Sequence, residues 1–284
     1  MVVSVTSKLV LLASALTLTP AVWATQTPAL PRVVSINLCT DQLLMLLADP
    51  GQIMGLGRLS RDAAGSVFHE LANDYSQLDP VAEELLPLAP DLVLTGPFTP
   101  RHTLSLLNEL GLRVETLPIA NSVDQMLDNV QRVGDLIQQV ERAADIIGHV
   151  RQRLAAIAVR VGLLTNPRPR AAVFDTNGYT VGDKSVRGQI LELSGWQNVA
   201  LEKDIEAYGV LGLEELISLR PQALVESPYS DSTYSRGQTL TRHPAIRASG
   251  LDPLIIHVPS NQTICAGPWT VDVIEQLLEV RENL

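Results

Sequence analysis

The chain has 284 residues, of which 46% are hydrophobic and 18% charged, and its formal net charge is −10. This length is sufficient for one large domain or for two lobes with their own cores. The acidic balance disfavours a nucleic-acid partner, because phosphate backbones are repelled by a negative surface. Two cysteines are too few for a disulfide-rich scaffold.

The N-terminus has the pattern of a secretory signal peptide. Lys8 precedes an apolar run from Leu9 to Leu18, and small residues lead to a predicted cleavage after Ala24. The apolar run is too short for a retained membrane helix. We therefore expect residues 1–24 to be removed, residues 25–31 to form a tether, and the mature chain to act in the periplasm.

Short apolar strands alternate with short helices in residues 32–121. Such alternation with glycine and proline breaks is typical of a parallel sheet covered by helices. We expect strands at RVVSIN (32–37), IMGLG (53–57), DLVLTG (91–96) and RVETLP (113–118). Helices are expected at DQLLMLLA (41–48), EELLPL (83–88) and RHTLSLLNELG (101–111).

A long helical segment is predicted for residues 122–166. Ser122 and Gln125 have the spacing of a capping box, and apolar residues then recur every three or four positions. The pattern weakens between Gly134 and Gln139, which predicts one helix on the first lobe and a second that bridges the lobes. A bridging helix of about 24 residues would be about 36 Å long. The TNPRPR segment ends it, because proline disfavours helix in the residue before it.

The second half of the chain repeats the order of the first. Strands are expected at RAAVFD (170–175), ALVES (223–227) and PLIIHVP (253–259), with helices at RGQILELSG (187–195), EELISL (214–219) and RHPAIRASG (242–250). EELLPLAPDLVLTGPF and EELISLRPQALVESPY are offset by 131 residues (214 − 83). We interpret this as an internal duplication. It predicts an α/β fold with two similar Rossmann-like lobes, residues 32–121 and 167–284, whose small parallel sheets are joined by one long helix.

RVVSINLCTDQLLMLLADP, both EEL segments and QILELSGWQNVA together resemble periplasmic solute-binding proteins of ABC importers for ferric siderophores, haem and cobalamin. The resemblance extends from about Arg32 to the C-terminus. It implies a monomer that holds an intact metal chelate between its lobes and delivers it to the transmembrane permease dimer in the inner membrane. No cofactor and no catalysis are implied. We favour a ferric siderophore or a corrinoid, with haem as an alternative.

The resemblance also implies a docking role for one glutamate in each lobe. In this family the permease-docking glutamate lies seven residues before the proline that precedes a strand. Counting back from Pro90 and Pro221 identifies Glu83 and Glu214, and the glutamate that follows each is the alternative. Exposed Glu–Arg contacts contribute little affinity, so we expect these residues to orient the protein on a permease.

Aromatic and arginine side chains concentrate in the loops expected to face the cleft. Ligands of open α/β sheets bind beyond the carboxyl ends of the strands. Aromatic faces suit a flat chelate, and guanidinium groups suit carboxylates. The predicted ligand-binding residues are Asn37, Arg58, Arg61, Phe98, Arg101, Tyr179, Tyr208, Tyr229, Tyr234, Arg236 and Trp269.

The two cysteines fall at the cleft ends of the first and last strands. Cys39 belongs to one expected lobe and Cys265 to the other. Three states are open: an inter-lobe disulfide, two packed thiols, or a thiolate that contacts ligand.

Two other classes of protein fit the sequence less well. Importers of free zinc or manganese use clustered histidines and carboxylates, whereas the five histidines here show no HxH or HxxxH spacing, so no metal site is expected. GLGRLSRDAAG has serine where a dinucleotide loop has its third glycine, and no P-loop, GxSxG or HExxH motif occurs. We therefore expect a binding protein rather than a periplasmic hydrolase or oxidoreductase.

Overall fold

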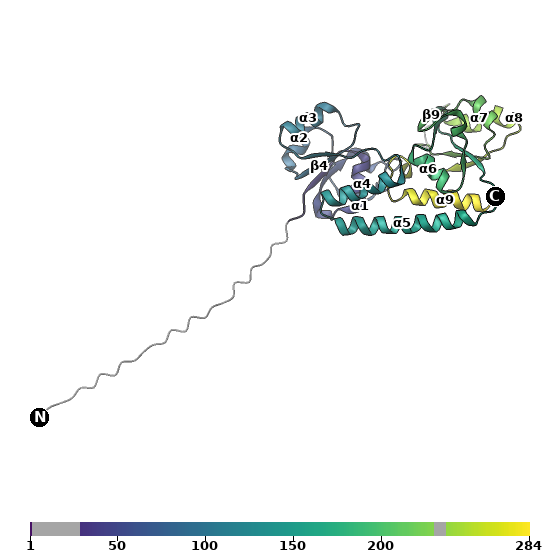
Figure 1. The fold of residues 1–284 in the computed structure, drawn as a ribbon. Coiled ribbons are helices and arrows are strands. Elements are labelled where there is room, and N and C mark those ends of the chain that lie inside the picture. Colours follow the sequence, from purple (N-terminus) through teal and green to yellow (C-terminus); the bar gives the residue numbers. More distant parts are fainter. Residues whose placement is uncertain (2–28, 230–236) are drawn as a thin grey trace.

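Two α/β lobes lie side by side, with a long helix running beneath both of them (Figure 1). The computed structural model describes Met1, residues 29–229 and residues 237–284. The predicted signal peptide, most of the tether, and the predicted ligand residues Tyr234 and Arg236 lie outside the described residues.

The N-terminal lobe is built on a five-stranded parallel sheet of order β3-β2-β1-β4-β5. Its strands are β1 (Val33–Ser35), β2 (Ile53–Gly57), β3 (Gln77–Leu78), β4 (Leu92–Thr95) and β5 (Val114–Thr116). Its helices are α1 (Leu38–Leu47), α2 (Ala82–Leu85) and α3 (Arg101–Glu109).

The C-terminal lobe has a four-stranded parallel sheet of order β11-β10-β6-β8. Strand for strand this matches β5-β4-β1-β2, so the predicted fold of two similar α/β lobes is confirmed. The strands of that sheet are β6 (Arg170–Val173), β8 (Gln197–Asn198), β10 (Ala223–Glu226) and β11 (Leu254–His257). An antiparallel pair, β7 (Tyr179–Val181) and β9 (Tyr208–Val210), is added to this lobe. Its helices are α6 (Val186–Leu193), α7 (Leu213–Leu219), α8 (Pro244–Ala248) and α9 (Thr270–Glu282).

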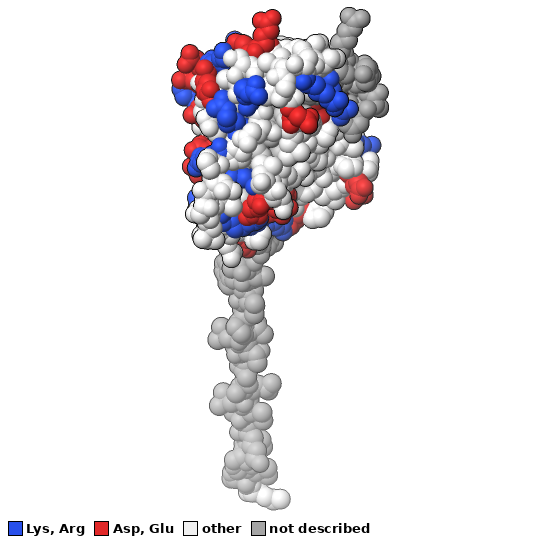
Figure 2. All heavy atoms as spheres, turned by 90° about the vertical axis from the view of Figure 1, so that its right-hand side faces the viewer, with Lys and Arg blue, Asp and Glu red and all other residues white. Residues whose placement is uncertain are grey.

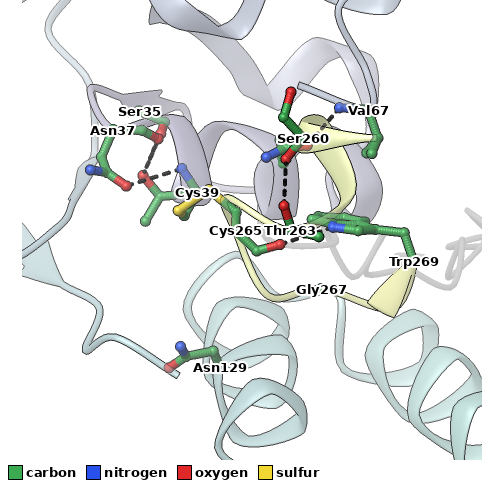
Figure 3. The surroundings of a disulfide bond; sticks show 12 residues. Ser35, Asn37, Cys39, Val67, Asn129, Ser260, Thr263, Cys265, Gly267 and Trp269 are labelled. Carbon is green, nitrogen blue, oxygen red and sulfur yellow. Dashed lines mark hydrogen bonds between the residues drawn. A yellow bond between two sulfur atoms is a disulfide. The ribbon is translucent and has the colours of Figure 1, made fainter. Parts of the chain in front are cut away.

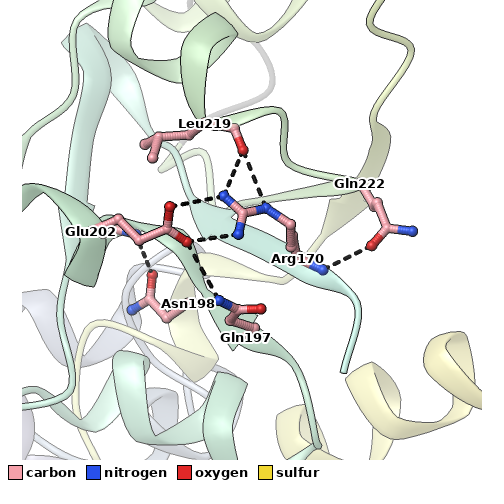
Figure 4. A network of polar contacts seen from close by, with 7 residues as sticks. Arg170, Gln197, Asn198, Glu202, Leu219 and Gln222 are labelled. Atoms are coloured by element: carbon pink, nitrogen blue, oxygen red, sulfur yellow. Dashed lines mark hydrogen bonds and ion pairs between the residues drawn. The ribbon is translucent and has the colours of Figure 1, made fainter. Parts of the chain in front are cut away.

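An arginine at the start of the central strand makes the same contact in both lobes. In the N-terminal lobe, Arg32 donates to the carbonyl of Leu88 at 2.8 Å. In the C-terminal lobe, Arg170 donates to the carbonyl of Leu219 at 2.7 Å and forms an ion pair with Glu202 (Figure 4). Each carbonyl ends the helical turn that begins with the repeated glutamates, so the duplication extends from sequence to side-chain contacts.

Two helices form the connection between the lobes. α4 (Val123–Leu136) is capped by Ser122, whose hydroxyl accepts the Gln125 N–H at 3.1 Å. The chain turns at Gln138, which has a positive φ of 59°. α5 (Val140–Leu163) then has 24 residues, which gives a length of about 36 Å and allows it to pass beneath both lobes.

A continuous apolar core lies beneath both sheets. It contains Leu44 from α1, Ile147 from α5, and Trp196 and Ile274 from the C-terminal lobe. The opposite face of each sheet has a smaller core of its own. Because opening the lobes about a hinge would expose the shared core to water, we expect their relative orientation to change little.

Ion pairs reinforce α5 against each lobe. In the N-terminal lobe, Arg142 pairs with Asp49 at 2.7 Å and donates to the carbonyl of Leu47 at 2.6 Å. Arg153 pairs with Glu275 of α9 at 2.6 Å, and this contact lowers the pKa of the carboxyl group. The C-terminal helix α9, which the sequence analysis does not predict, therefore makes a second layer against the bridging helix.

Among residues 29–229 and 237–284, no helix combines the length and apolarity needed to cross a bilayer. The end formed by the C-terminal lobe shows acidic and basic side chains intermixed around an uncharged area (Figure 2).

Asp41 in the first turn of α1 is a buried carboxyl group. Neither of its oxygens forms a hydrogen bond of good geometry with a described residue. Burial raises the pKa of Asp41 well above its usual value of 3.8, although polar groups of Ser35 and Gly57 favour the charged form. The folded state therefore binds this proton more tightly than the unfolded chain does, and stability falls as pH rises above the unfolded pKa.

We expect Asp41→Asn to raise the free energy of unfolding at pH 7 by about 1–3 kcal/mol, since the amide is never charged. Below about pH 3 the aspartate is protonated in both states, so the gain is expected to vanish. Urea unfolding at both pH values measures the difference. An equal gain at both would show that ionisation of Asp41 has no part in it.

Candidate functional site

A cavity of about 560 Å³ lies between the two lobes. In the N-terminal lobe its walls come from the loops after β1, β4 and β5 and from α4. In the C-terminal lobe they come from the loops after β10 and β11, the start of α6, and the β7–β9 pair. The carboxyl ends of both parallel sheets thus point into one space, as expected for ligand sites of this architecture.

Four predicted aromatic residues line this cavity. They are Phe98, Tyr179, Tyr208 and Tyr229. Tyr179 stacks on Tyr208, with ring centroids 6.4 Å apart and planes inclined by 22°. Burial raises the pKa of Tyr179. Phe98 is 81% exposed at the rim, a position that leaves its whole face available to a partner.

Most polar groups in the wall are uncharged. The predicted residue Asn37 lines the cavity and caps α1 by accepting the Cys39 N–H at 3.0 Å. A Cβ at Gly96 would lie 2.6 Å from the Asn37 amide, so glycine is needed for this close approach. Asn129, Ser227 and Thr263 contribute further neutral donors and acceptors.

A disulfide joins Cys39 to Cys265, and both residues line the cavity (Figure 3). Cys39 follows β1 in the first lobe and Cys265 follows β11 in the second, with Cα atoms 5.2 Å apart. Of the three states open from sequence, the structure contains the inter-lobe bridge. The two halves of the site are therefore covalently linked at its base.

Hydrogen bonds also cross between the lobes around the cavity. The Tyr208 hydroxyl donates to Asn121 at 2.8 Å, and the Tyr229 hydroxyl bonds to Asp62. The Ser260 hydroxyl donates to the Ala64 carbonyl at 2.6 Å. Together with the disulfide, these contacts fix the width of the cleft.

Four predicted ligand residues lie away from the cavity. Arg58 forms an ion pair with Asp79, and Arg61 donates to backbone carbonyls, including that of Tyr75 at 2.9 Å. Arg101 is exposed at the first position of α3. Trp269 is 8% exposed; its indole N–H donates to the Cys265 carbonyl at 2.9 Å and its ring packs edge-on against Phe68. Arg61 and Trp269 stabilise their loops, and none of the four side chains lines the site.

One arginine that the sequence analysis missed does line the cavity. Arg187, in the first turn of α6, forms a 2.6 Å ion pair with Asp175, the second residue after β6. In the described part of the chain, no three His, Cys, Asp or Glu residues come together as the ligands of a bare metal ion would. The size of the cavity and its aromatic and neutral polar lining suit non-covalent capture of a sizeable molecule.

A family model described as "Periplasmic binding protein" matches residues 33–249. The chain belongs to this periplasmic binding protein family. The match covers the N-terminal lobe, the two connecting helices and the C-terminal lobe as far as α8, in agreement with the two-lobed architecture.

The sequence identity between this chain and its curated relatives is low. A cobalamin-binding protein of Halobacterium salinarum is 26% identical over 201 residues, which cover 70% of this chain and 54% of that protein. The chain thus spans about half the length of the curated relatives it matches.

Solved structures of low identity share the fold. A periplasmic heme binding protein from Pseudomonas aeruginosa has a TM-score of 0.70 at 21% identity, covering 89% of this chain and 92% of that one. A periplasmic vitamin B12 binding protein of Vibrio cholerae has a TM-score of 0.66 at 16% identity, covering 89% and 97%.

Each lobe of this periplasmic binding protein carries two adjacent glutamates on its outer surface. Glu215 accepts the N–H of Gly212, the N-cap of α7, at 2.9 Å, and Glu84 accepts the N–H of Asp79, two residues before the N-cap of α2, at 2.7 Å. Glu83 and Glu214 precede them and are exposed. At matched positions in both lobes, one glutamate is therefore bonded to the backbone and the other is accessible.

Proposed function

We propose that this protein is an exported substrate-binding component of an ABC importer that captures an intact corrinoid between its lobes. The cobalamin-binding relative supports this ligand class. The protein carries out no reaction; it presents the bound chelate to a permease in the inner membrane.

The composition of the cavity wall is the observation that carries the proposal. A corrinoid offers a flat macrocycle surrounded by uncharged amide side chains. The wall offers aromatic faces, such as those of Tyr179 and Tyr208, together with neutral hydrogen-bonding groups such as those of Asn37 and Asn129. Burying amides against neutral donors and acceptors leaves no charge unpaired, which keeps the desolvation cost low.

Equilibrium titration of the purified protein tests the proposal. We expect cyanocobalamin to bind with a dissociation constant in the micromolar range or below, and more tightly than hemin or a ferric citrate chelate. Absorbance and intrinsic fluorescence report each binding event. Absence of cyanocobalamin binding, with tight binding of another chelate, would contradict the corrinoid assignment.

Haem is the second candidate, because three tyrosines line the wall, two of which would have to give up their hydrogen bonds to Asn121 or Asp62 to bind iron. Phenolate oxygen is a known axial ligand of ferric haem. If haem is the ligand, hemin will bind more tightly than cyanocobalamin, and Tyr179→Phe, Tyr208→Phe or Tyr229→Phe will shift the Soret band. A haem spectrum that none of the three replacements changes would exclude tyrosine ligation.

Glu83 and Glu214 are the residues we propose for docking on the permease. Both are exposed, one on each lobe, and the adjacent glutamate is already bonded to a backbone N–H in both cases. A rigid connection between the lobes would keep the two carboxylates at a constant separation, which suits recognition by a permease with two matching basic sites.

A further inference from the structure

An ion pair stands behind one wall of the cavity. The Asp175 carboxylate lies 2.6 Å from Arg187, and the two side chains are only 14% and 15% exposed. The second Asp175 oxygen accepts the Ser227 N–H at 2.7 Å, which fixes the carboxylate in place. Arg187 itself lines the cavity, and Asp175 does not.

Arg187 is the only residue with a formal charge among the described residues that line the cavity. It lies in the first turn of α6, where the helix dipole disfavours a cation. Its charge is therefore stabilised mainly by Asp175. With one guanidinium nitrogen bonded to that carboxylate, the wall presents N–H donors without a net charge.

We propose that Asp175 makes the cavity selective against anionic chelates by neutralising Arg187. This inference rests on the proposed function and names the feature that sets its ligand class. A ligand carboxylate approaching Arg187 meets a guanidinium that is already paired, and it also meets the negative charge of Asp175. A neutral carbonyl or amide oxygen accepts a hydrogen bond from Arg187 without that repulsion.

Two substitutions of the pair should change selectivity in opposite directions. Asp175→Asn retains an acceptor for the Ser227 N–H but removes the neutralising charge, so Arg187 becomes a free cation in the wall. Arg187→Gln leaves the Asp175 charge unpaired, so the wall becomes negative. Asp183→Asn is the matched control, since Asp183 is exposed on the same segment and outside the cavity lining.

Dissociation constants for cyanocobalamin, hemin and ferric citrate, measured on all four proteins, test this proposal. We expect Asp175→Asn to increase the affinity for ferric citrate and hemin, relative to cyanocobalamin, by about tenfold. Arg187→Gln should lower the same ratio, and Asp183→Asn should leave it unchanged.

Two outcomes separate this proposal from the proposed function. Wild-type protein that binds cyanocobalamin, together with an Asp175→Asn ratio no different from that of Asp183→Asn, would overturn the selectivity role alone. Wild-type protein that binds none of the three chelates would overturn both. A ratio shifted in the same direction by Asp175→Asn and Arg187→Gln would indicate general damage to the site and would also overturn the role.

Discussion

Replacing Glu83 and Glu214 together by arginine is expected to abolish uptake of the ligand by cells while leaving the affinity of the isolated protein unchanged. Both side chains are exposed on the outer surfaces of the lobes, away from the cavity. Charge reversal turns an attraction to basic permease residues into a repulsion, which acts on both the encounter and the orientation of the complex. A radiolabelled ligand and cells that depend on this protein give the uptake rate.

A second double variant controls for the change in net charge. Asp128→Arg with Asp145→Arg alters the charge by the same amount at exposed positions on α4 and α5. We expect this protein to support uptake at close to the wild-type rate. Uptake retained by the Glu83/Glu214 variant would contradict the docking assignment. Loss of uptake in both double variants would show that the change in net charge, and not the position of the glutamates, is responsible.

Removing the inter-lobe disulfide by Cys39→Ser with Cys265→Ser is expected to lower the free energy of unfolding by about 2–5 kcal/mol. The bridge joins residues separated by 226 positions, so it restricts the unfolded chain over most of its length. The chain-entropy model gives about 5 kcal/mol for a loop of this size as an upper estimate. Ligand affinity is also expected to fall, by about tenfold or less, since the cavity loses its covalent base but keeps its shared core.

Urea unfolding and ligand titration, each with and without a thiol reductant, provide the measurement. The reductant should bring wild-type protein to the stability of the double serine variant and leave that variant unaffected. Equal stability of the two proteins under oxidising conditions would show that the bridge does not form or does not contribute.

Much of the fold was predictable because the strongest local signals occur twice. Each EEL helix is followed by a proline and a buried strand, and the residue that ends each helical turn, Ala89 or Arg220, has a left-handed φ of 43° or 49° at the shared offset of 131 residues (220 − 89). A helix, proline and strand that recur in the same order in both halves predict the topology of both lobes more reliably than one occurrence would.

The arginines of the site were harder to predict, because their partners are distant in sequence. Arg58 lies in a loop that was expected to face the cleft, but its side chain forms an ion pair with Asp79, the residue after β3. No local sequence pattern indicates this contact. Arg187 did carry a signal. Ser185 is a strong N-cap residue, and a cation two positions later is unfavourable for the helix dipole, so its presence indicates a partner or a function.

Helix α9 and the β7–β9 pair depend on contacts formed only in the folded chain. α9 packs against α5 through Arg153 and Arg160, whose partners lie more than a hundred positions away. The β7–β9 strands are three residues each and take their register from Tyr179 opposite Val210. Strands this short have too little periodicity to be recognised in sequence.

Native mass spectrometry of the protein isolated from its own cells, combined with its absorbance spectrum, tests the central claim most directly. A rigid two-lobed receptor for an intact corrinoid predicts one such molecule per chain, with unchanged mass and the visible bands of a corrin. A haem spectrum, a bare metal ion, or a chemically altered small molecule in the complex would contradict that account.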